Sequence, residues 1–135
     1  MSYLFIVSSY LIGSINFAYL VAKYKKLDIS SSGSGNPGTS NVMRTIGKKY
    51  AAFVLIGDVL KGFLPILLFS ENLLVCGFAA VIGHIYPIFY KFKGGKGVAT
   101  YIGVYIAFST LNPVSYDLFE NSYFLFLNIP LLAAF

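Results

Sequence analysis

The sequence predicts an all-α integral membrane protein, a polytopic helix bundle of about four to five transmembrane segments with two Gly/Lys-rich cytoplasmic loops. Of the 135 residues, 57% are hydrophobic and 11% are charged, and the mean hydropathy is +0.74. This composition is too apolar for an ordinary soluble domain. Long uncharged runs alternate with short basic segments, and such runs cross a bilayer as helices because hydrocarbon offers the backbone no hydrogen-bond partner. We therefore expect residues 1–135 to form a single transmembrane domain.

The basic residues indicate how the chain is oriented in the membrane. The net charge of +5 arises from ten basic and five acidic residues. Nine of the basic residues form three clusters, each at the end of an apolar run: Lys23, Lys25 and Lys26; Arg44, Lys48 and Lys49; and Lys91, Lys93 and Lys96. Cytoplasmic loops carry such clusters, so the N-terminus is expected outside and nucleic acid is excluded as a partner. Cys76 is the lone cysteine, and no metal or other cofactor is expected.

The apolar runs predict four spanning helices and one shorter segment. The first, at 2–22, is long enough for a hydrocarbon core of about 30 Å at about 1.5 Å per residue. Three more are predicted at 50–70, 73–90 and about 98–110, and the polar stretch 27–47 is predicted to be a structured or re-entrant loop. Residues 111–121 are expected to form a loop. Residues 122–135 would make a helix of only about 21 Å, so the chain is expected to stop within a membrane segment.

Two loops combine glycine with basic residues, a combination that is typical of anion sites. Successive glycines allow backbone N–H groups to converge on phosphate oxygens, while Lys or Arg adds charge. The candidates are Ser34, Gly35, Asn36, Ser40, Asn41 and Arg44 in the first loop, and Lys93, Gly94, Gly95, Lys96 and Gly97 in the second. Under the alternative interpretation the glycines only make turns and the lysines only orient the protein. Neither loop is a Walker A motif, which disfavours a nucleotide hydrolase.

Three further polar residues lie within predicted membrane helices. Asp58 and Lys61 are three residues apart and therefore share one helix face. A charge at mid-membrane costs about 2.5 to 3.5 kcal/mol, so we expect the pair to face a polar cavity; the alternative is a neutralised structural pair. His84 precedes Lys93 by nine residues and is expected to be a phosphate ligand or an acid/base. Its alternative is a hydrogen-bonded core histidine.

The two loops resemble two signatures of the bacterial glycerol-3-phosphate acyltransferases that use acyl-phosphate. The first signature is similar to Ser-Gly-Asn-x-Gly-Ala-Thr-Asn-x-x-Arg, which residues 34–44 match with Thr39-Ser40 in place of Ala-Thr. The second is similar to Gly-His-x-Tyr/Phe-Pro followed by Phe-Lys-Gly-Gly-Lys-Gly-Val-Ala-Thr, at 83–87 and 92–100. Asp58 and Lys61 lie in a similar Asp-x-x-Lys-Gly context. The resemblance covers about residues 1–103, and the family's third motif, with Arg, His and Glu, is not found.

The resemblance implies transfer of a fatty acyl group from acyl-phosphate to the 1-hydroxyl of glycerol 3-phosphate, giving lysophosphatidic acid for phospholipid biosynthesis. It also implies a bacterial inner-membrane location. The implied partners are glycerol 3-phosphate, acyl-phosphate, the lipid bilayer and the soluble enzyme that forms acyl-phosphate. Lys96, Lys93, His84 and Arg44 are then the catalytic candidates, and Ser34, Gly35, Asn36, Ser40, Asn41, Asp58, Lys61, Gly94, Gly95 and Gly97 are the substrate-binding candidates. No Ser-His-Asp arrangement or reactive cysteine is evident, which favours direct transfer without an acyl-enzyme.

The missing third motif leaves an alternative function open. The chain would then be a catalytically inactive remnant, or a small membrane subunit that binds phosphorylated lipid or anion through the same loops. On this ground we expect the purified chain to show little or no acyl transfer beside a full-length relative, with its phosphate affinity retained. An anion transporter is disfavoured because the polar residues gather at one face instead of lining a path across the bilayer.

Overall fold

The computed structural model describes residues 2–69 and 71–111, and these residues form helices and loops without a strand. The helices are α1 (Ser2–Ser14), α2 (Phe17–Tyr24), α3 (Thr39–Thr45), α4 (Lys48–Leu68), α5 (Leu73–Ile85) and α6 (Val98–Leu111), with 3-10 turns at Ile29–Ser31 and Ile88–Tyr90. The predicted all-α class is confirmed. The expected loop and last apolar segment at 112–135 lie outside the described residues, and Leu111, expected in that loop, closes α6.

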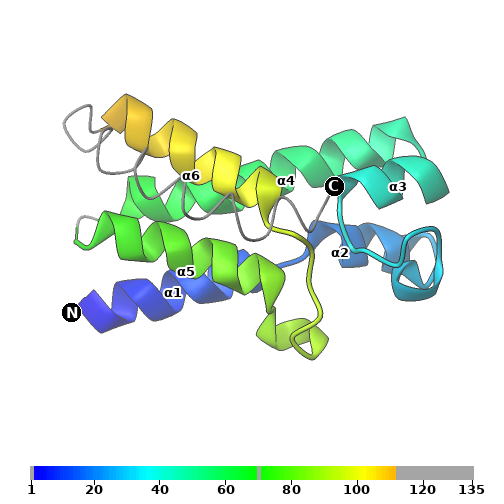
Figure 1. Cartoon of the computed structure of the whole chain (residues 1–135), viewed down its shortest axis with the longest axis horizontal. Coiled ribbons are helices and arrows are strands. Elements are labelled where there is room, and N and C mark those ends of the chain that lie inside the picture. The colour runs from blue at the N-terminus through cyan, green and yellow to red at the C-terminus, as the bar shows by residue number, and fades with distance from the viewer. Residues whose placement is uncertain (1, 70, 112–135) are drawn as a thin grey trace.

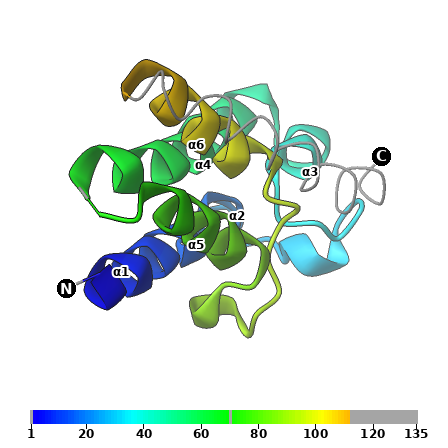
Figure 2. The same ribbon diagram turned by 60° about the vertical axis from the view of Figure 1, so that its left-hand side comes forward.

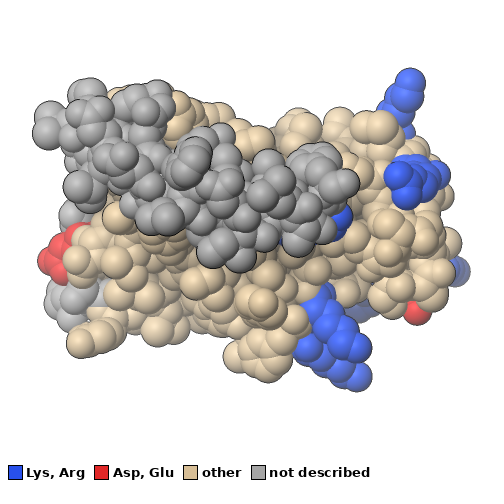
Figure 3. All heavy atoms as spheres, in the orientation of Figure 1, with Lys and Arg blue, Asp and Glu red and all other residues tan. Residues whose placement is uncertain are grey.

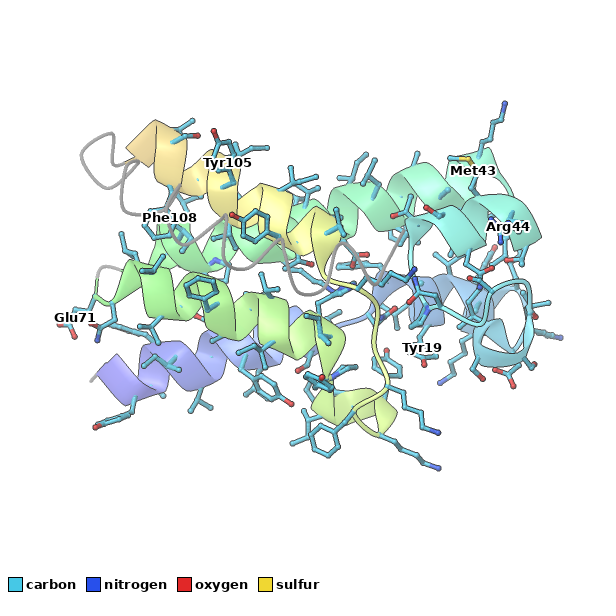
Figure 4. The ribbon with its side chains drawn as sticks, in the orientation of Figure 1. Tyr19, Met43, Arg44, Glu71, Tyr105 and Phe108 are labelled. Carbon is cyan, nitrogen blue, oxygen red and sulfur yellow. The ribbon has the colours of Figure 1, made fainter. Side chains whose placement is uncertain are left out.

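Three segments of the described chain are long and apolar enough to cross a membrane: Tyr3–Tyr24, Lys48–Leu68 and Leu73–Tyr90. The apolar helix α6 is shorter. Figure 1 shows α1, α4, α5 and α6 lying side by side, with α2 and α3 at one end. Lys and Arg side chains gather at this end, whereas Glu71 marks the opposite end (Figures 3 and 4). The bundle therefore has one basic end, as the sequence predicts.

The first membrane segment is two helices, whereas the sequence predicted one continuous helix. α1 ends at Ser14, and α2 begins after Asn16, whose backbone is extended and whose side chain accepts a hydrogen bond from the Tyr19 N–H at 3.0 Å. The break frees the Ile15 carbonyl, which accepts a hydrogen bond from Lys61 Nζ at 2.6 Å. A break within a membrane is stable only where a neighbour satisfies the freed backbone groups. The Lys61 side chain meets this requirement.

The stretch predicted as a polar loop contains a helix, which corrects that prediction. α3 is short, but Val42 on it is fully buried. It belongs to an apolar cluster of α2, α3, α4 and the first 3-10 turn, formed by Ala18, Val21, Ala22, Ile29, Val42, Ala51 and Val54. This packing holds the second half of the first motif against α4. The stability of α3 therefore comes from tertiary burial more than from helix propensity.

Four glycines allow close packing within two helix pairs, α1 with α5 and α4 with α6. Gly13 and Gly83 lie between α1 and α5, and Gly62 and Gly103 lie between α4 and α6. At each of the four, a Cβ would collide with a carbonyl oxygen of the facing helix, those of Ala80, Tyr10, Thr100 and Val59 respectively. Membrane helices associate through small residues that allow such close approach. Figure 2 shows the α4–α6 pair lying beside the α1–α5 pair.

Replacement of Gly62 by leucine is expected to destabilise the bundle. The new side chain would press on the Thr100 carbonyl, and overpacking of a tight contact costs about 1 to 3 kcal/mol or more. Unfolding can be followed in detergent by the reaction of a thiol dye with Cys76, which is buried in the native state. Ala52→Leu, at an exposed position of the same helix, is the matched control. Equal stability of the two variants would show that the α4–α6 contact is not tight.

Candidate functional site

The two glycine-rich motifs line one cavity of about 450 Å³. Its walls come from the first loop and α3 (Ser34, Asn36, Gly38, Thr39, Ser40, Asn41, Arg44), from α4 (Leu55, Asp58), from α5 (His84), and from the second loop and α6 (Lys96, Gly97, Val98, Ala99, Ile102). Segments about 60 residues apart in the chain thus meet in space. Arg44 and Tyr19, the latter on α2, lie at the basic end of the bundle (Figure 4).

The first loop is shaped by the side chain of Asn41, which is only 1% exposed. Its Oδ1 accepts a hydrogen bond from the Ser34 N–H at 3.0 Å, and its Nδ2 donates to the Ser32 carbonyl at 3.0 Å. Gly33, with a φ of +55°, packs against the same amide. The Asn41 amide therefore fixes the loop conformation that presents Ser34 to the cavity. A buried amide with both ends satisfied is a rigid support.

The second loop is bound to the end of α5 through its main chain. The Gly94 N–H donates to the Ile85 carbonyl at 3.0 Å, and the Gly95 N–H donates to the His84 carbonyl at 3.2 Å. These two N–H groups therefore do not form the anion nest that the sequence predicted, because both already have acceptors. Glycine is needed here for space instead: a Cβ at either position would collide with His84. Gly97, with a φ of +83°, turns the chain into α6.

Asn16 and Tyr19 connect the two loops to the first membrane segment. Asn16 Nδ2 donates to the Pro37 carbonyl of the first loop at 3.3 Å, and Tyr19 Oη donates to the Lys93 carbonyl of the second at 2.8 Å. The Tyr19 ring also stacks on Tyr90, with centroids 4.5 Å apart. Neither residue was predicted from the sequence as part of the site. The one available signal was an asparagine inside an apolar run.

A buried charge cluster forms the floor of the cavity. Asp58 Oδ1 lies 2.9 Å from Lys61 Nζ and 3.7 Å from His84 Nδ1, and the three side chains are 2–4% exposed. Asp58 and His84 line the cavity, whereas Lys61 does not and reaches Ile15 instead. Each interpretation of the pair therefore holds for one of its residues. Asp58 faces the polar cavity, whereas Lys61 has a structural role. Pairing is what makes two buried charges tolerable.

Several predicted site residues lie outside the cavity wall. Lys61, Gly35, Lys93, Gly94 and Gly95 do not line it, and the Lys93 side chain is exposed. The cationic residues on the wall are Arg44 and Lys96. Six wall residues were not predicted as site residues: Gly38, Thr39, Val98 and Ala99, which lie within the two motifs, and Leu55 and Ile102, which lie outside them. Leu55 and Ile102 are apolar residues of apolar helices, so no local pattern marks them.

The wall suits a ligand that is anionic at one part and apolar at another. Two cations lie beside hydroxyl and amide groups, an arrangement that binds phosphate oxygens. The hydroxyl of Thr39 is buried and has no hydrogen-bond partner among the described residues, so it is free to bind a ligand. Leu55, Val98 and Ile102 add apolar surface beside these polar groups. Such a mixed wall fits a phosphorylated amphiphile.

Comparison with known proteins identifies the chain's relatives. The family model described as glycerol-3-phosphate acyltransferase matches residues 3–129. The glycerol-3-phosphate acyltransferase of Aquifex aeolicus is 48% identical over 111 residues, which are 77% of this chain and 58% of the relative. That of Methylobacillus flagellatus is 50% identical over 115 residues, 79% of this chain and 58% of the relative. The chain thus spans 58% of the length of these curated relatives.

Two solved structures have the same fold. The crystal structure of PlsY, an integral membrane glycerol 3-phosphate acyltransferase, in the glycerol 3-phosphate form superposes with a TM-score of 0.74 at 46% identity, over 79% of this chain and 57% of that one. The lysophosphatidic acid form superposes with a TM-score of 0.71. The predicted helix bundle and the recognised motifs thus point to the same relatives. The chain belongs to the glycerol-3-phosphate acyltransferase family of integral membrane proteins.

Proposed function

We propose that this chain forms the substrate site of an acyltransferase that moves a fatty acyl group from acyl-phosphate to glycerol 3-phosphate. The observation that carries the proposal is the convergence of both motifs and the Asp58–His84 floor on one cavity with two cations. Each substrate has a phosphate, and one also has a long apolar chain, which matches the mixed wall. Glycerol 3-phosphate and lysophosphatidic acid forms of a relative with the same fold support this assignment.

The proposed roles follow from the position of each side chain. Arg44 binds a phosphate together with the hydroxyl and amide groups of Ser34, Asn36, Thr39 and Ser40. Lys96, from the second loop, stabilises the negative charge that develops on the acyl carbonyl oxygen. The 1-hydroxyl oxygen of glycerol 3-phosphate bonds to the acyl carbon, the bond from that carbon to the phosphate oxygen breaks, and the hydroxyl proton passes to a phosphate oxygen. The products are lysophosphatidic acid and inorganic phosphate.

The proposed location is the bacterial inner membrane, with the cavity at the cytoplasmic face. The three basic clusters lie at the cavity end of the bundle, and Glu71 lies at the other (Figures 3 and 4). Basic residues favour the cytoplasmic side. Leu55 and Ile102, each 43% exposed, give the cavity an apolar side through which an acyl chain can extend into the bilayer. A soluble enzyme that forms acyl-phosphate would then deliver its product at this surface.

The proposal is tested by substrate binding and turnover of the purified protein in lipid nanodiscs. Where the chain has measurable turnover, Lys96→Ala is expected to lower acyl-phosphate-dependent formation of lysophosphatidic acid by about 10²- to 10³-fold, the usual effect of removing one oxyanion donor. Lys23→Ala, which removes the same charge from the same end of the bundle but lies outside the cavity wall, is expected to retain turnover. Equal turnover of the two variants at equal protein level would contradict the assigned role.

The same measurement separates the enzyme from the alternative function. An inactive remnant or an anion-binding subunit would bind glycerol 3-phosphate, with Arg44→Ala reducing its affinity, and would form no lysophosphatidic acid. Turnover that requires both substrates and Lys96 supports the enzyme. Binding without turnover supports the alternative, and absence of both would contradict the assignment of the cavity.

The orientation predicts a labelling pattern for single cysteines. In a Cys76→Ala background, Glu71→Cys is expected to react with a membrane-impermeant reagent added to intact spheroplasts, and Lys48→Cys is expected to react only after the membrane is opened. The reason is that Glu71 lies at the end of the bundle opposite to the basic clusters. Labelling of Lys48→Cys from outside would reverse the topology and place the cavity on the wrong side for a cytoplasmic substrate.

The buried ion pair predicts a characteristic double-mutant cycle. Lys61→Met leaves Asp58 without its cation and the Ile15 carbonyl without its donor, so the free energy of unfolding should fall by about 3 to 5 kcal/mol. Asp58→Asn combined with Lys61→Met should be less destabilising than the sum of the two single changes. Thiol-dye unfolding at Cys76 measures all of these variants, with Lys23→Met as the control. Strict additivity would show that the two side chains do not interact.

A further inference from the structure

A second cavity, of about 480 Å³, lies between α2 and α4. It is lined by Leu20, Val21 and Tyr24 from α2 and by Lys49, Tyr50 and Phe53 from α4. We call it the α2–α4 groove. Its surface is almost wholly apolar except for Lys49, and Leu20, Tyr24 and Phe53 are 44%, 75% and 55% exposed. None of the predicted site residues lines this groove.

The groove and the proposed reaction cavity lie on opposite faces of α4. Successive residues of an α-helix are rotated by about 100°. Lys49, Tyr50 and Phe53 therefore fall within an arc of about 100°, whereas Asp58 and Leu55 fall on the far side of the helix axis. The buried residue Val54, which packs into the core cluster, lies between the two faces around the helix axis. An acyl chain in the reaction cavity would thus not enter the α2–α4 groove.

The groove changes from basic to apolar along its length. α2 and α4 run antiparallel here, because the Phe17 ring meets the Phe53 ring edge-on at 5.9 Å while Lys25, just after α2, lies over the Tyr50 ring. The end near Tyr50 therefore carries Lys25 and Lys49. The other end, toward the middle of the membrane segments, carries Leu20 and Phe53. A phospholipid changes in a matching way along its length, from a charged phosphate to an apolar chain.

Lys25 is held at the rim of the groove. Its Nζ lies 4.5 Å from the centroid of the Tyr50 ring and 5.9 Å from that of Tyr24, distances at which a cation and an aromatic face attract each other. A side-chain hydrogen bond with Tyr50 raises the pKa of Lys25 above its ordinary value. The ammonium group is therefore charged at neutral pH and is oriented before any ligand arrives. Lys49 supplies a second cation at the same end.

We propose that the α2–α4 groove binds one anionic phospholipid of the surrounding bilayer. The lipid phosphate contacts Lys25 and Lys49, and the upper part of one acyl chain lies between Leu20 and Phe53. Charge complementarity selects the occupant: an anionic headgroup interacts with two cations without a positive charge of its own, whereas a zwitterionic headgroup brings a competing cation. This site is separate from the proposed acyl transfer, so neither proposal depends on the other.

The test uses a tryptophan reporter in the groove. The chain has no tryptophan, so Phe53→Trp introduces the single one, and its fluorescence is quenched by lipids with brominated acyl chains. The protein is reconstituted in mixtures of brominated phosphatidylglycerol or brominated phosphatidylcholine with unbrominated lipid. We expect the anionic lipid to quench preferentially. Because one basic side chain near an anionic headgroup contributes about fivefold in affinity, Lys25→Gln with Lys49→Gln should reduce this preference by about 25-fold.

A matched pair of substitutions separates a site from general surface charge. Lys23→Gln with Lys26→Gln removes the same charge from the same end of the bundle. This double variant should retain the preference, because neither residue lines the groove, as Lys49 does, or is held over the Tyr24 and Tyr50 rings, as Lys25 is. An equal loss in both double variants would overturn the proposal in favour of a diffuse basic surface. Equal quenching by the two lipids would identify an ordinary lipid-facing groove. Absence of quenching together with a dimer in detergent would identify a second copy of the chain as the occupant.

A second tryptophan reporter tests whether the Phe53→Trp substitution itself alters lipid binding. Leu20→Trp places the fluorophore on the α2 wall, opposite to Phe53. Both reporters should give the same lipid preference. A preference seen with one reporter and absent with the other would contradict a lipid that lies between the two helices.

Discussion

The hydrogen bond from Lys61 to the Ile15 carbonyl connects the break in the first membrane segment to the buried charges of α4. The first membrane segment is interrupted at Ile15 and Asn16, and an exposed carbonyl in hydrocarbon is costly. The ammonium group that satisfies it must itself be neutralised, which Asp58 does at 2.9 Å. Asp58 in turn faces His84 at 3.7 Å and the cavity. The break in the first membrane segment thus explains why Lys61 and Asp58 are retained inside α4. It also explains why this pair lies beside the cavity.

Main-chain carbonyls accept several of the hydrogen bonds that position the two loops. Pro37 and Lys93 offer their carbonyls to α2, and His84 and Ile85 offer theirs to the second loop. The close approach that these bonds require is the reason for the glycines at 94 and 95. The Gly94 and Gly95 N–H groups are used in these hydrogen bonds. The cationic groups on the cavity wall are therefore the side chains of Arg44 and Lys96.

The sequence predicts the membrane segments well because composition alone determines which runs must be shielded from water. The sequence also predicts correctly that the two motifs lie at the same end of the bundle, because both belong to basic loops. The prediction from sequence fails where two different backbone structures, such as a continuous and a broken helix, are compatible with the same composition. The break at Ile15 and Asn16 lies within a long apolar run, and α3 lies in a stretch rich in turn residues and is stabilised by tertiary burial, including that of Val42. The Gly94 and Gly95 N–H groups donate to carbonyls at the end of α5. No local sequence pattern predicts these contacts.

The rotation of α4 about its axis links these features. One face carries Tyr50 and Phe53 on the α2–α4 groove, and the opposite side carries Asp58 on the cavity and, one turn further along, Gly62 against α6. A shift of one residue along the helix would turn it by about 100° and point the Asp58 carboxylate at lipid. Gly57 against the Phe17 ring and Gly62 against the Thr100 carbonyl admit no larger residue in this rotation. The packing glycines therefore matter for the cavity as much as the charged residues do, because they determine which face of α4 lines it.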